Sequence, residues 1–362
     1  MRRPDMNPVL SQADNLYEYP AQELASQLLY LRREDVEEIC NELDAVALMA
    51  EVFRLKAAGE IILPDEAYLS WKNLHGEPVR SLNMPVYVGG KFSTAGTKII
   101  NSNPANTKRG LPRASGLTLL FDDETVRVTC VMEGAHISAL RTAAVSTLSI
   151  SLVGNAPIHS AAIIGTGAIG AMHLELMVKT FSSLQRVMLF DLNRAQAEGL
   201  AEKTSRTHRN VEVASSAEEA VQSSEVVIAA TTVTTGYIRY EWLRPGAVVV
   251  NVSLDDLLPE VFLKAGKIFI DDWNLVRQDS RRLLGKMCRE GLIAGPQETS
   301  NPNARKIDGE LCDIVAGGHP GRSNSEEVIV VNPFGLAIED IAFATRIFEI
   351  AQTRGVGIPL KT

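Results

Sequence analysis

The sequence predicts an α/β protein with a Rossmann-type doubly wound parallel sheet and a second domain of α+β type. A glycine-rich turn, Gly-Thr-Gly-Ala-Ile-Gly at residues 165–170, separates an apolar run from a helix-compatible segment. Apolar runs alternate with helical segments over residues 159 to about 275, as parallel strands with crossover helices require. The chain of 362 residues is also long enough for two hydrophobic cores.

The residues before the alternating region predict the second domain. Residues 1 to about 20 are polar and contain proline, which indicates a loose arm. A short strand is expected at 29–31, and a helix at 34–58 because its apolar residues recur at helical spacing. A long helix is expected at 132–152. Between these helices we expect short strands punctuated by glycine and proline, at 68–71, 86–88, 97–100 and 116–121, with a turn at 122–125.

The alternating region and the C-terminal segment complete the expected elements. Helices are expected at 168–181, 193–206 and 216–223, and the strands of the parallel sheet at 160–164, 186–190, 211–214, 225–230, 247–252 and 267–271. Beyond them we expect a helix at 281–292, an irregular stretch at 301–322, a strand at 328–332 and a closing amphipathic helix at 339–353.

The glycine turn has the features of a dinucleotide site. Gly165 permits the tight turn from strand to helix, and Gly170 lets the helix pack close to the sheet. Gly167 has no Cβ, so a pyrophosphate can approach backbone N–H groups at the positive end of the helix. The residues between the glycines are also expected to contact the cofactor: Thr166, Ala168 and Ile169.

An acid at the end of the next apolar run selects the cofactor. Asp191 would accept hydrogen bonds from the hydroxyls of the adenosine ribose and would repel a 2′-phosphate. Its charge therefore favours NAD over NADP as the cofactor. Arg194, also a cofactor candidate, leaves NADP as the alternative. We therefore place the NAD-binding domain at residues 153–319. The domain for substrate binding and dimerisation is placed at 1–152 and 320–362.

Other cofactor candidates follow later strands of the sheet. Thr231 and Thr232 end the strand at 225–230, where the chain would pass the nicotinamide ribose, although ordinary strand-end caps have the same pattern. Ser253 follows the strand at 247–252. Gly335 would let backbone approach the nicotinamide, and a simple turn glycine is the alternative.

Composition excludes several classes of function. A formal charge of −8 argues against nucleic acid or an anionic membrane as the main partner. No uninterrupted apolar run approaches the roughly 20 residues that cross a bilayer, and the N-terminus does not resemble a secretory signal. The histidines show no metal-ligand spacing, so no metal is expected. Widely spaced cysteines predict reduced thiols in a cytoplasmic enzyme: Cys40, Cys130, Cys288 and Cys312.

Three residues could carry the chemistry of an amino-acid substrate, which needs cations for its carboxylate and an acid–base group for its nitrogen. Lys98 alternates with apolar residues in a predicted strand; a solvated lysine is the alternative. Arg141 lies in an apolar helix, where pairing with an acid such as Glu133 is the alternative. Asp256 follows a strand at the edge where open α/β sheets bind ligands, and a helix N-cap is the alternative.

The order of motifs along the chain resembles that of the ornithine cyclodeaminase/μ-crystallin family, over nearly the whole chain from about residue 28. The motifs are Lys98-Ile-Ile, Pro104-Ala-Asn, Gly110-Leu-Pro-Arg-Ala-Ser-Gly, the segment 132–144, the glycine turn, Asn251-Val-Ser-Leu-Asp-Asp and the segment 331–340. Further blocks are similar to the siderophore-pathway branch, the N-(2-amino-2-carboxyethyl)-L-glutamate dehydrogenases. These blocks include Arg113-Ala-Ser-Gly, Tyr237-Ile-Arg-Tyr-Glu-Trp-Leu and Asp271-Asp-Trp.

The resemblance implies roles for individual residues. Lys98 and Arg141 match the family's cations on the carboxylate and carbonyl side of the substrate, and Asp256 matches its acid–base aspartate. Arg80 matches an arginine ahead of a Met-Pro pair in the branch. The branch usually has arginine where this chain has Ser70, so Lys72 or Arg80 would have to supply that cation.

The implied reaction is NAD-dependent oxidation of an N-substituted amino acid, followed by hydrolysis to 2-oxoglutarate and 2,3-diaminopropionate. Cyclodeamination of ornithine or lysine, ketimine reduction, and a crystallin-like protein that binds a dinucleotide without turnover are the alternatives. The resemblance also implies a homodimer formed through the sheet of the first domain.

Overall fold

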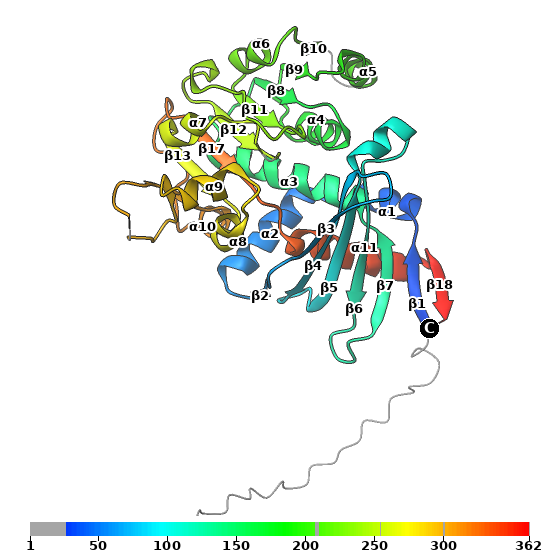
Figure 1. The fold of residues 1–362 in the computed structure, drawn as a ribbon. Helices are drawn as coiled ribbons and strands as arrows, with labels where there is room; N and C mark the ends of the chain where they lie inside the picture. The colour runs from blue at the N-terminus through cyan, green and yellow to red at the C-terminus, as the bar shows by residue number, and fades with distance from the viewer. Residues whose placement is uncertain (1–26, 207–209, 254, 300, 362) are drawn as a thin grey trace, which may run out of the picture.

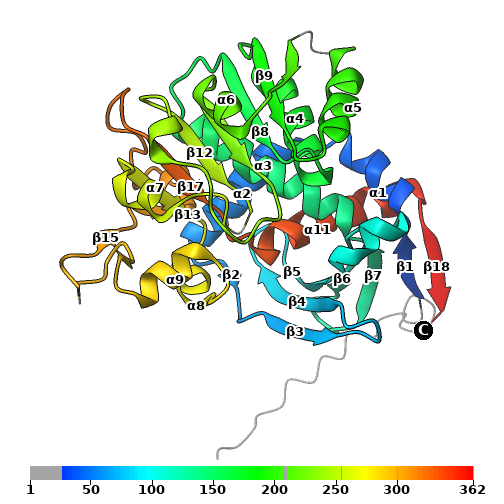
Figure 2. The same cartoon turned by 45° about the horizontal axis from the view of Figure 1, so that its top comes forward.

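The protein is described by a computed structural model over residues 27–206, 210–253, 255–299 and 301–361. Two β-sheets lie one above the other in Figure 1, with helix α3 (Ala135–Val153) between them. Figure 2 shows the same two layers after rotation. The loose arm expected at residues 1–20 lies outside the described residues.

The first sheet has the strand order β18-β1-β7-β6-β5-β4-β2, with β3 paired to β4. Its pairings are antiparallel except for that of β1 with β7. The strands are β1 (Gln27–Leu31), β2 (Ile61–Ile62), β3 (Ala67–Lys72), β4 (Pro78–Val88), β5 (Thr94–Ser102), β6 (Ala114–Phe121), β7 (Val128–Glu133) and β18 (Ile358–Lys361).

The second sheet has the strand order β10-β9-β8-β11-β12-β17-β13-β16, and its pairings are parallel, which confirms the predicted Rossmann-type sheet. The strands are β8 (Ser160–Ile164), β9 (Arg186–Phe190), β10 (Val211–Val213), β11 (Val226–Ala229), β12 (Val248–Asn251), β13 (Lys267–Ile270), β16 (Gly309–Glu310) and β17 (Ile329–Asn332). The crossover helices are α4 (Ala168–Thr180), α5 (Arg194–Ser205), α6 (Ala217–Gln222) and α7 (Pro259–Lys264). The order reverses between β8 and β11, and ligands bind at such a switch point.

The C-terminal part of the chain contributes to both sheets. This corrects the domain boundary that was expected at residue 320. β17 pairs with β12 and β13, so it belongs to the parallel sheet. The chain returns to the first sheet only with α11 (Ala337–Arg354) and β18. The first sheet is therefore built from two separate parts of the chain, and the turn between β17 and α11 lies where the two layers meet.

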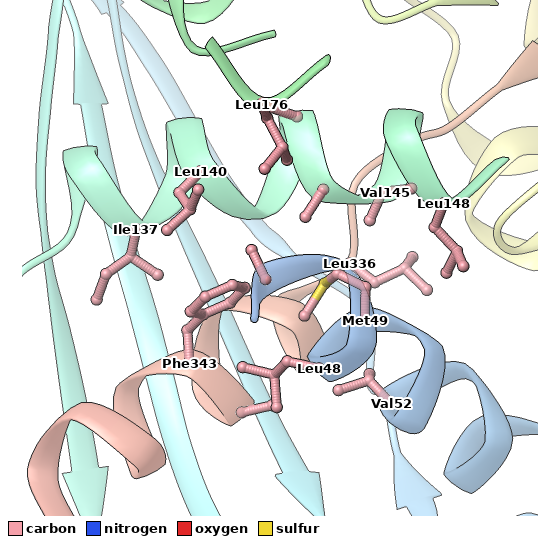
Figure 3. Close-up of a cluster of buried hydrophobic side chains, with 14 of the residues drawn as sticks. Leu48, Met49, Val52, Ile137, Leu140, Val145, Leu148, Leu176, Leu336 and Phe343 are labelled. Carbon is pink, nitrogen blue, oxygen red and sulfur yellow. The ribbon is translucent and has the colours of Figure 1, made fainter. Parts of the chain in front are cut away.

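The hydrophobic core between the layers is formed by α2 (Ala45–Ala57), α3 and α11 (Figure 3). Met49, Ile137 and Phe343 come from these three helices and are fully buried. Among the described residues, α3 is long and apolar enough to span a bilayer. However, 72% of its most apolar 18-residue segment is buried inside this fold. The position of α3 in the core explains its apolar composition.

Three sequence predictions need correction in detail. The helix expected at 34–58 is broken into α1 (Arg33–Cys40) and α2, because Asp44 caps α2 by accepting a hydrogen bond from the N–H of Ala47. The helix expected from residue 132 begins only at Ala135. The stretch at 301–322 contains short regular elements. The remaining described elements are η2 (Pro104–Arg109), η3 (Tyr240–Trp242), α8 (Trp273–Gln278), α9 (Leu283–Arg289), α10 (Leu311–Val315), β14 (Ile293–Ala294) and β15 (Arg305–Lys306).

Candidate active site

The glycine turn between β8 and α4 has the shape that its sequence predicts. Gly165 has φ +93°, and a Cβ there would lie 2.7 Å from the carbonyl oxygen of Ala230. A Cβ on Gly170 would lie 1.9 Å from the carbonyl oxygen of Gly165. Gly167 differs, because a Cβ there would meet only the Nε2 of Gln196, at 3.8 Å. The open side of Gly167 fits the approach of a pyrophosphate to the start of α4.

Asp191 lies directly beside this turn. Its Oδ2 accepts hydrogen bonds from the backbone N and the Oγ1 of Thr166, at 2.7 and 3.0 Å, and its Oδ1 accepts one from the N of Asn193 at 2.9 Å. Arg194 is instead paired with Glu198 on the surface of α5, at 2.7 Å. The acid is therefore fixed at the end of β9, and Arg194 is engaged in a contact within its own helix.

Asp256 is buried at the end of the parallel sheet. Its Oδ1 accepts hydrogen bonds from Thr231 Oγ1 at 2.7 Å and from Tyr237 OH at 2.8 Å. Its Oδ2 is buried without a hydrogen-bond partner. The N-cap of the following helix is Leu258, so Asp256 does not cap α7. Burial raises the pKa of the Asp256 carboxyl above its ordinary value, although both hydroxyl groups oppose the shift.

Lys98 and Arg141 form a buried charge cluster with two acids that the sequence analysis did not assign. Lys98 Nζ lies 2.8 Å from Asp340 Oδ1 and donates to Ser138 Oγ at 2.8 Å. Arg141 Nη1 donates to Glu339 Oε2 at 2.7 Å, and its Nε lies 3.2 Å from Asp340 Oδ2. The two cations, which come from β5 and α3, therefore meet at the first turn of α11.

Burial changes the acidity of this cluster. Desolvation and the neighbouring Arg141 lower the pKa of Lys98 to about 8, although Asp340 opposes the shift. Desolvation raises the pKa of Glu339 to about 8, although Arg141 opposes this. Arg141 does not pair with Glu133, because that carboxylate accepts the N–H groups of Ala135 and His136 at the start of α3.

The turn after β17 packs directly against the side chain of Arg141. Gly335 has φ +93°, and a Cβ there would lie 2.7 Å from Arg141 Nη1. Asp271 holds this turn, because its carboxylate accepts the N–H groups of Phe334 at 2.8 Å and of Gly335 at 2.6 Å. The turn positions the guanidinium group of Arg141 from one side, while Glu339 binds it from another.

We expect Gly335→Ala to lower kcat/KM for the substrate by about tenfold or more, because the new Cβ displaces the Arg141 guanidinium. The positive φ adds a loss of about 1–3 kcal/mol in the free energy of unfolding. Gly355→Ala is the matched control, since Gly355 has φ +66° and nothing within 4 Å of the built Cβ. Steady-state kinetics and urea unfolding of both variants separate the two effects. Equal kcat/KM in both variants would show that Gly335 does not position Arg141.

A pocket of about 170 Å³ joins these elements. It is lined by Arg141, Thr142 and Val145 of α3, Ile169 of the glycine turn, Val252 after β12, Arg282, and Pro333, Phe334 and Gly335 after β17. The glycine turn and Arg141 therefore face one cavity. Val252 lies four residues before Asp256, so the pocket and this acid lie at the same edge of the sheet. Within the described residues, no hydrogen bond or ion pair connects Asp256 to the buried charge cluster.

The other predicted residues lie around this centre. Ser253 is buried and its Oγ has no hydrogen-bond partner, while Thr232 is exposed. Arg80 lies opposite Ser70 in the β3–β4 pair. It is four residues along β4 from Met84, the partner of Lys98, which corresponds to about 13 Å. Lys72 is exposed at the end of β3. These two cations are therefore separated from Lys98.

Sequence reasoning did not assign several residues of the site. Glu339 and Asp340 lie in the first turn of the amphipathic helix α11, and such acids also occur where they only complement a helix dipole. Tyr237 and Arg282 lie in segments without a recognisable period. The signal available in the sequence is a pair of adjacent acids that interrupts the apolar run of residues 336–344.

The parallel sheet and the glycine turn are those of a dinucleotide-binding protein, and the relatives of the chain show that it is an NAD-dependent oxidoreductase acting on amino acids. The comparisons with known proteins agree. Residues 27–355 match the ornithine cyclodeaminase/mu-crystallin family. The chain therefore belongs to that family, which confirms the resemblance seen in the sequence.

Three relatives illustrate the similarity. The chain is 33% identical to an N-((2S)-2-amino-2-carboxyethyl)-L-glutamate dehydrogenase of Staphylococcus aureus, covering 92% of this chain and 98% of that one. The crystal structure of CmnK has 37% identity and a TM-score of 0.85, with 92% and 98% coverage. The Δ1-pyrroline-2-carboxylate reductase of Thermococcus litoralis, solved with NADH and L-proline, has 27% identity and a TM-score of 0.81, with 91% and 99% coverage.

Proposed function

We propose that this protein oxidises N-(2-amino-2-carboxyethyl)-L-glutamate with NAD and hydrolyses the product to 2-oxoglutarate and 2,3-diaminopropionate. The observation that carries the proposal is the buried carboxyl of Asp256, whose Oδ2 is unpaired at the sheet edge that also presents the pocket of Arg141. The similarity to the staphylococcal dehydrogenase supports this substrate over others of the family.

The cofactor would lie along the glycine turn. The open side of Gly167 would receive the pyrophosphate, and Asp191 would bind the adenosine ribose. Ile169 lines the pocket and Thr231 bonds Asp256, which supports a position of the nicotinamide ring between the glycine turn and this acid. When bound, NAD supplies the acceptor for the hydride that leaves the Cα of the glutamate part of the substrate.

The basic side chains orient the substrate. Arg141 lines the pocket and offers a planar guanidinium to a carboxylate, while Lys98 adds positive charge behind it. Glu339 and Asp340 hold both cations in place. These contacts would fix the Cα–N bond of the substrate in one orientation, because the cluster that holds its carboxylate is buried and its members hold one another in place.

Asp256 would carry the protons of the hydrolytic steps. Loss of hydride leaves a substrate iminium, and water adds to its carbon while Asp256 Oδ2 accepts the proton of that water. The same proton then passes to the amine nitrogen, and the carbinolamine hydroxyl gives its own proton to Asp256 Oδ2 as the C–N bond breaks and the C=O bond of 2-oxoglutarate forms. Tyr237 and Thr231 hold Oδ1, so Oδ2 remains directed for transfer. The raised pKa of Asp256 suits a group that must both accept and return a proton.

The test is to incubate the purified protein with NAD and N-(2-amino-2-carboxyethyl)-L-glutamate. Absorbance at the NADH band follows oxidation, and mass spectrometry identifies 2-oxoglutarate and 2,3-diaminopropionate. Ornithine and lysine serve as comparison substrates. Cyclised product from ornithine or lysine without accumulated NADH would contradict the dehydrogenase and identify a cyclodeaminase. Stabilisation by NAD with no turnover of any substrate would identify a dinucleotide-binding protein.

We also propose that two copies associate through the first sheet in a cytoplasmic homodimer. Leu69, Trp71 and Leu117 are 61%, 48% and 42% exposed. The strand register places all three on the face opposite Lys98, away from the helices. An apolar sheet face of this kind fits a second copy of the chain. The four cysteines are free, which is compatible with the reducing compartment that we propose. Light scattering that gives the mass of a single chain would contradict the dimer.

A further inference from the structure

Glu66 is an acid beside the buried charge cluster that has no partner of its own. Its Oε1 is buried without a hydrogen bond. Within the described residues, no ion pair includes Glu66, whereas Asp340 and Glu339 each lie within 3.2 Å of a cation. A buried polar atom without a partner costs about 1–3 kcal/mol, so its retention suggests a ligand.

The strand register places Glu66 on the same face of the sheet as Lys98. Ala67 pairs with Asn83, so Glu66, one residue earlier, lies in the row of Met84. Met84 pairs in turn with Lys98 on β5. Glu66 and Lys98 are therefore two strands apart in one row, about 10 Å between backbones, with side chains on one face.

Two arginines from the segment between α8 and α9 lie near Glu66. Arg281 lies over the ring of Tyr68, with its Cζ 4.2 Å from the ring centroid, and Tyr68 is two residues from Glu66 on the same face. Arg282 lines the pocket together with Arg141. Burial raises the pKa of Glu66, while the nearby cations Arg282, Arg281, Lys98 and Arg141 oppose the shift.

Arg281 and Arg282 already form ion pairs with another acid. Arg281 Nε lies 2.8 Å from Asp279 Oδ1, and Arg282 Nε lies 3.5 Å from Asp279 Oδ2. Arg282 also donates to the carbonyl oxygens of Pro333 and Phe334. Glu66 is therefore an additional acid near Arg141 and Arg282, which line the pocket, and its unpaired Oε1 is available to a positive group of a ligand.

We propose that Glu66 binds the primary ammonium group of the substrate, so that the enzyme selects N-substituted amino acids that carry a second basic nitrogen. The inference rests on the proposed function, because it assigns one group of that substrate to this residue. The substrate carboxylate binds Arg141, and the ammonium group at the other end meets Glu66. A substrate without the primary ammonium group leaves the carboxylate of Glu66 unpaired.

The test compares two substrates that differ in one group: N-(2-amino-2-carboxyethyl)-L-glutamate and N-(2-carboxyethyl)-L-glutamate, which lacks the primary amine. In the wild-type enzyme, kcat/KM is expected to be about 10- to 100-fold higher for the first, the range expected for a hydrogen bond between charged groups. Glu66→Gln is expected to remove most of this preference by lowering turnover of the diamino substrate alone. Asp65→Asn, a neighbouring exposed acid, is the matched control and is expected to retain the preference.

Each outcome decides the proposal. Equal kcat/KM for the two substrates in the wild-type enzyme overturns it, even if Glu66→Gln fails to fold. Equal losses on both substrates in a folded Glu66→Gln variant also overturn it, because they would mean that Glu66 only offsets the charge of the arginines. If either of these outcomes is found but NADH is produced from one of the substrates, the proposed dehydrogenase activity is still supported. Absence of NADH from both substrates overturns the function and the inference together.

Discussion

Asp256→Asn is expected to lower kcat by roughly 10²- to 10⁴-fold, the usual contribution of a general acid–base group. Asparagine can still accept the hydrogen bonds of Thr231 and Tyr237, so the local structure is retained. It cannot exchange a proton at the position of Oδ2. NAD affinity is expected to be unchanged, because the glycine turn and Asp191 are not altered. Steady-state kinetics and a fluorescence titration with NADH check the two statements.

The same variant is expected to be more stable than the wild type at neutral pH. Burial raises the folded-state pKa of Asp256, so ionisation of this carboxyl opposes folding at pH values above its unfolded-state pKa. The neutral amide does not carry this penalty. As pH falls below the unfolded-state pKa, the wild-type carboxyl is protonated in both states and the difference disappears. Urea unfolding at several pH values measures this trend.

Tyr237→Phe is the control for the role of Asp256. It removes one hydrogen bond to Oδ1 and leaves the carboxyl in place. A smaller loss of turnover is expected, with a shift of the pH profile toward higher pH, because the lost hydrogen bond had lowered the pKa of Asp256. Turnover of Asp256→Asn equal to that of Tyr237→Phe would contradict proton transfer by Asp256.

The local parts of this site could be predicted from sequence because their physical requirements lie in short segments. Gly165 and Gly170 are required by backbone contacts with Ala230 and within the turn, and Asp191 ends the adjacent strand. The strands of the parallel sheet were predicted for the same reason, since each is a short apolar run between turns. Such features depend on few residues at fixed spacing.

The partners of the cations could not be predicted in this way. Arg141 and Glu339 are 198 positions apart in sequence and meet only because β17 enters the parallel sheet before α11 returns to the first one. The boundary expected at residue 320 missed this crossing. Glu66 was also missed, because its position depends on the register of β3, β4 and β5 rather than on its neighbours in sequence.

Arg141→Met is expected to abolish turnover and to lower the free energy of unfolding by about 3–5 kcal/mol, the usual cost of removing one partner of a buried ion pair. Glu339 is fully buried, and without Arg141 its carboxylate loses the cation that opposes its raised pKa of about 8. The loss should be largest at alkaline pH, where Glu339 would be ionised, and should decrease as acid protonates it.

Arg141→Met/Glu339→Gln distinguishes the structural part of this effect from the functional part. Replacing Glu339 with a neutral amide removes the uncompensated charge, so part of the lost stability is expected to return, and its pH dependence to weaken. Turnover should not return, because the substrate carboxylate still lacks its guanidinium partner. Urea unfolding and NADH formation are measured on the single and double variants together. Recovery of turnover in the double variant would show that Arg141 acts only by neutralising Glu339 and does not bind the substrate.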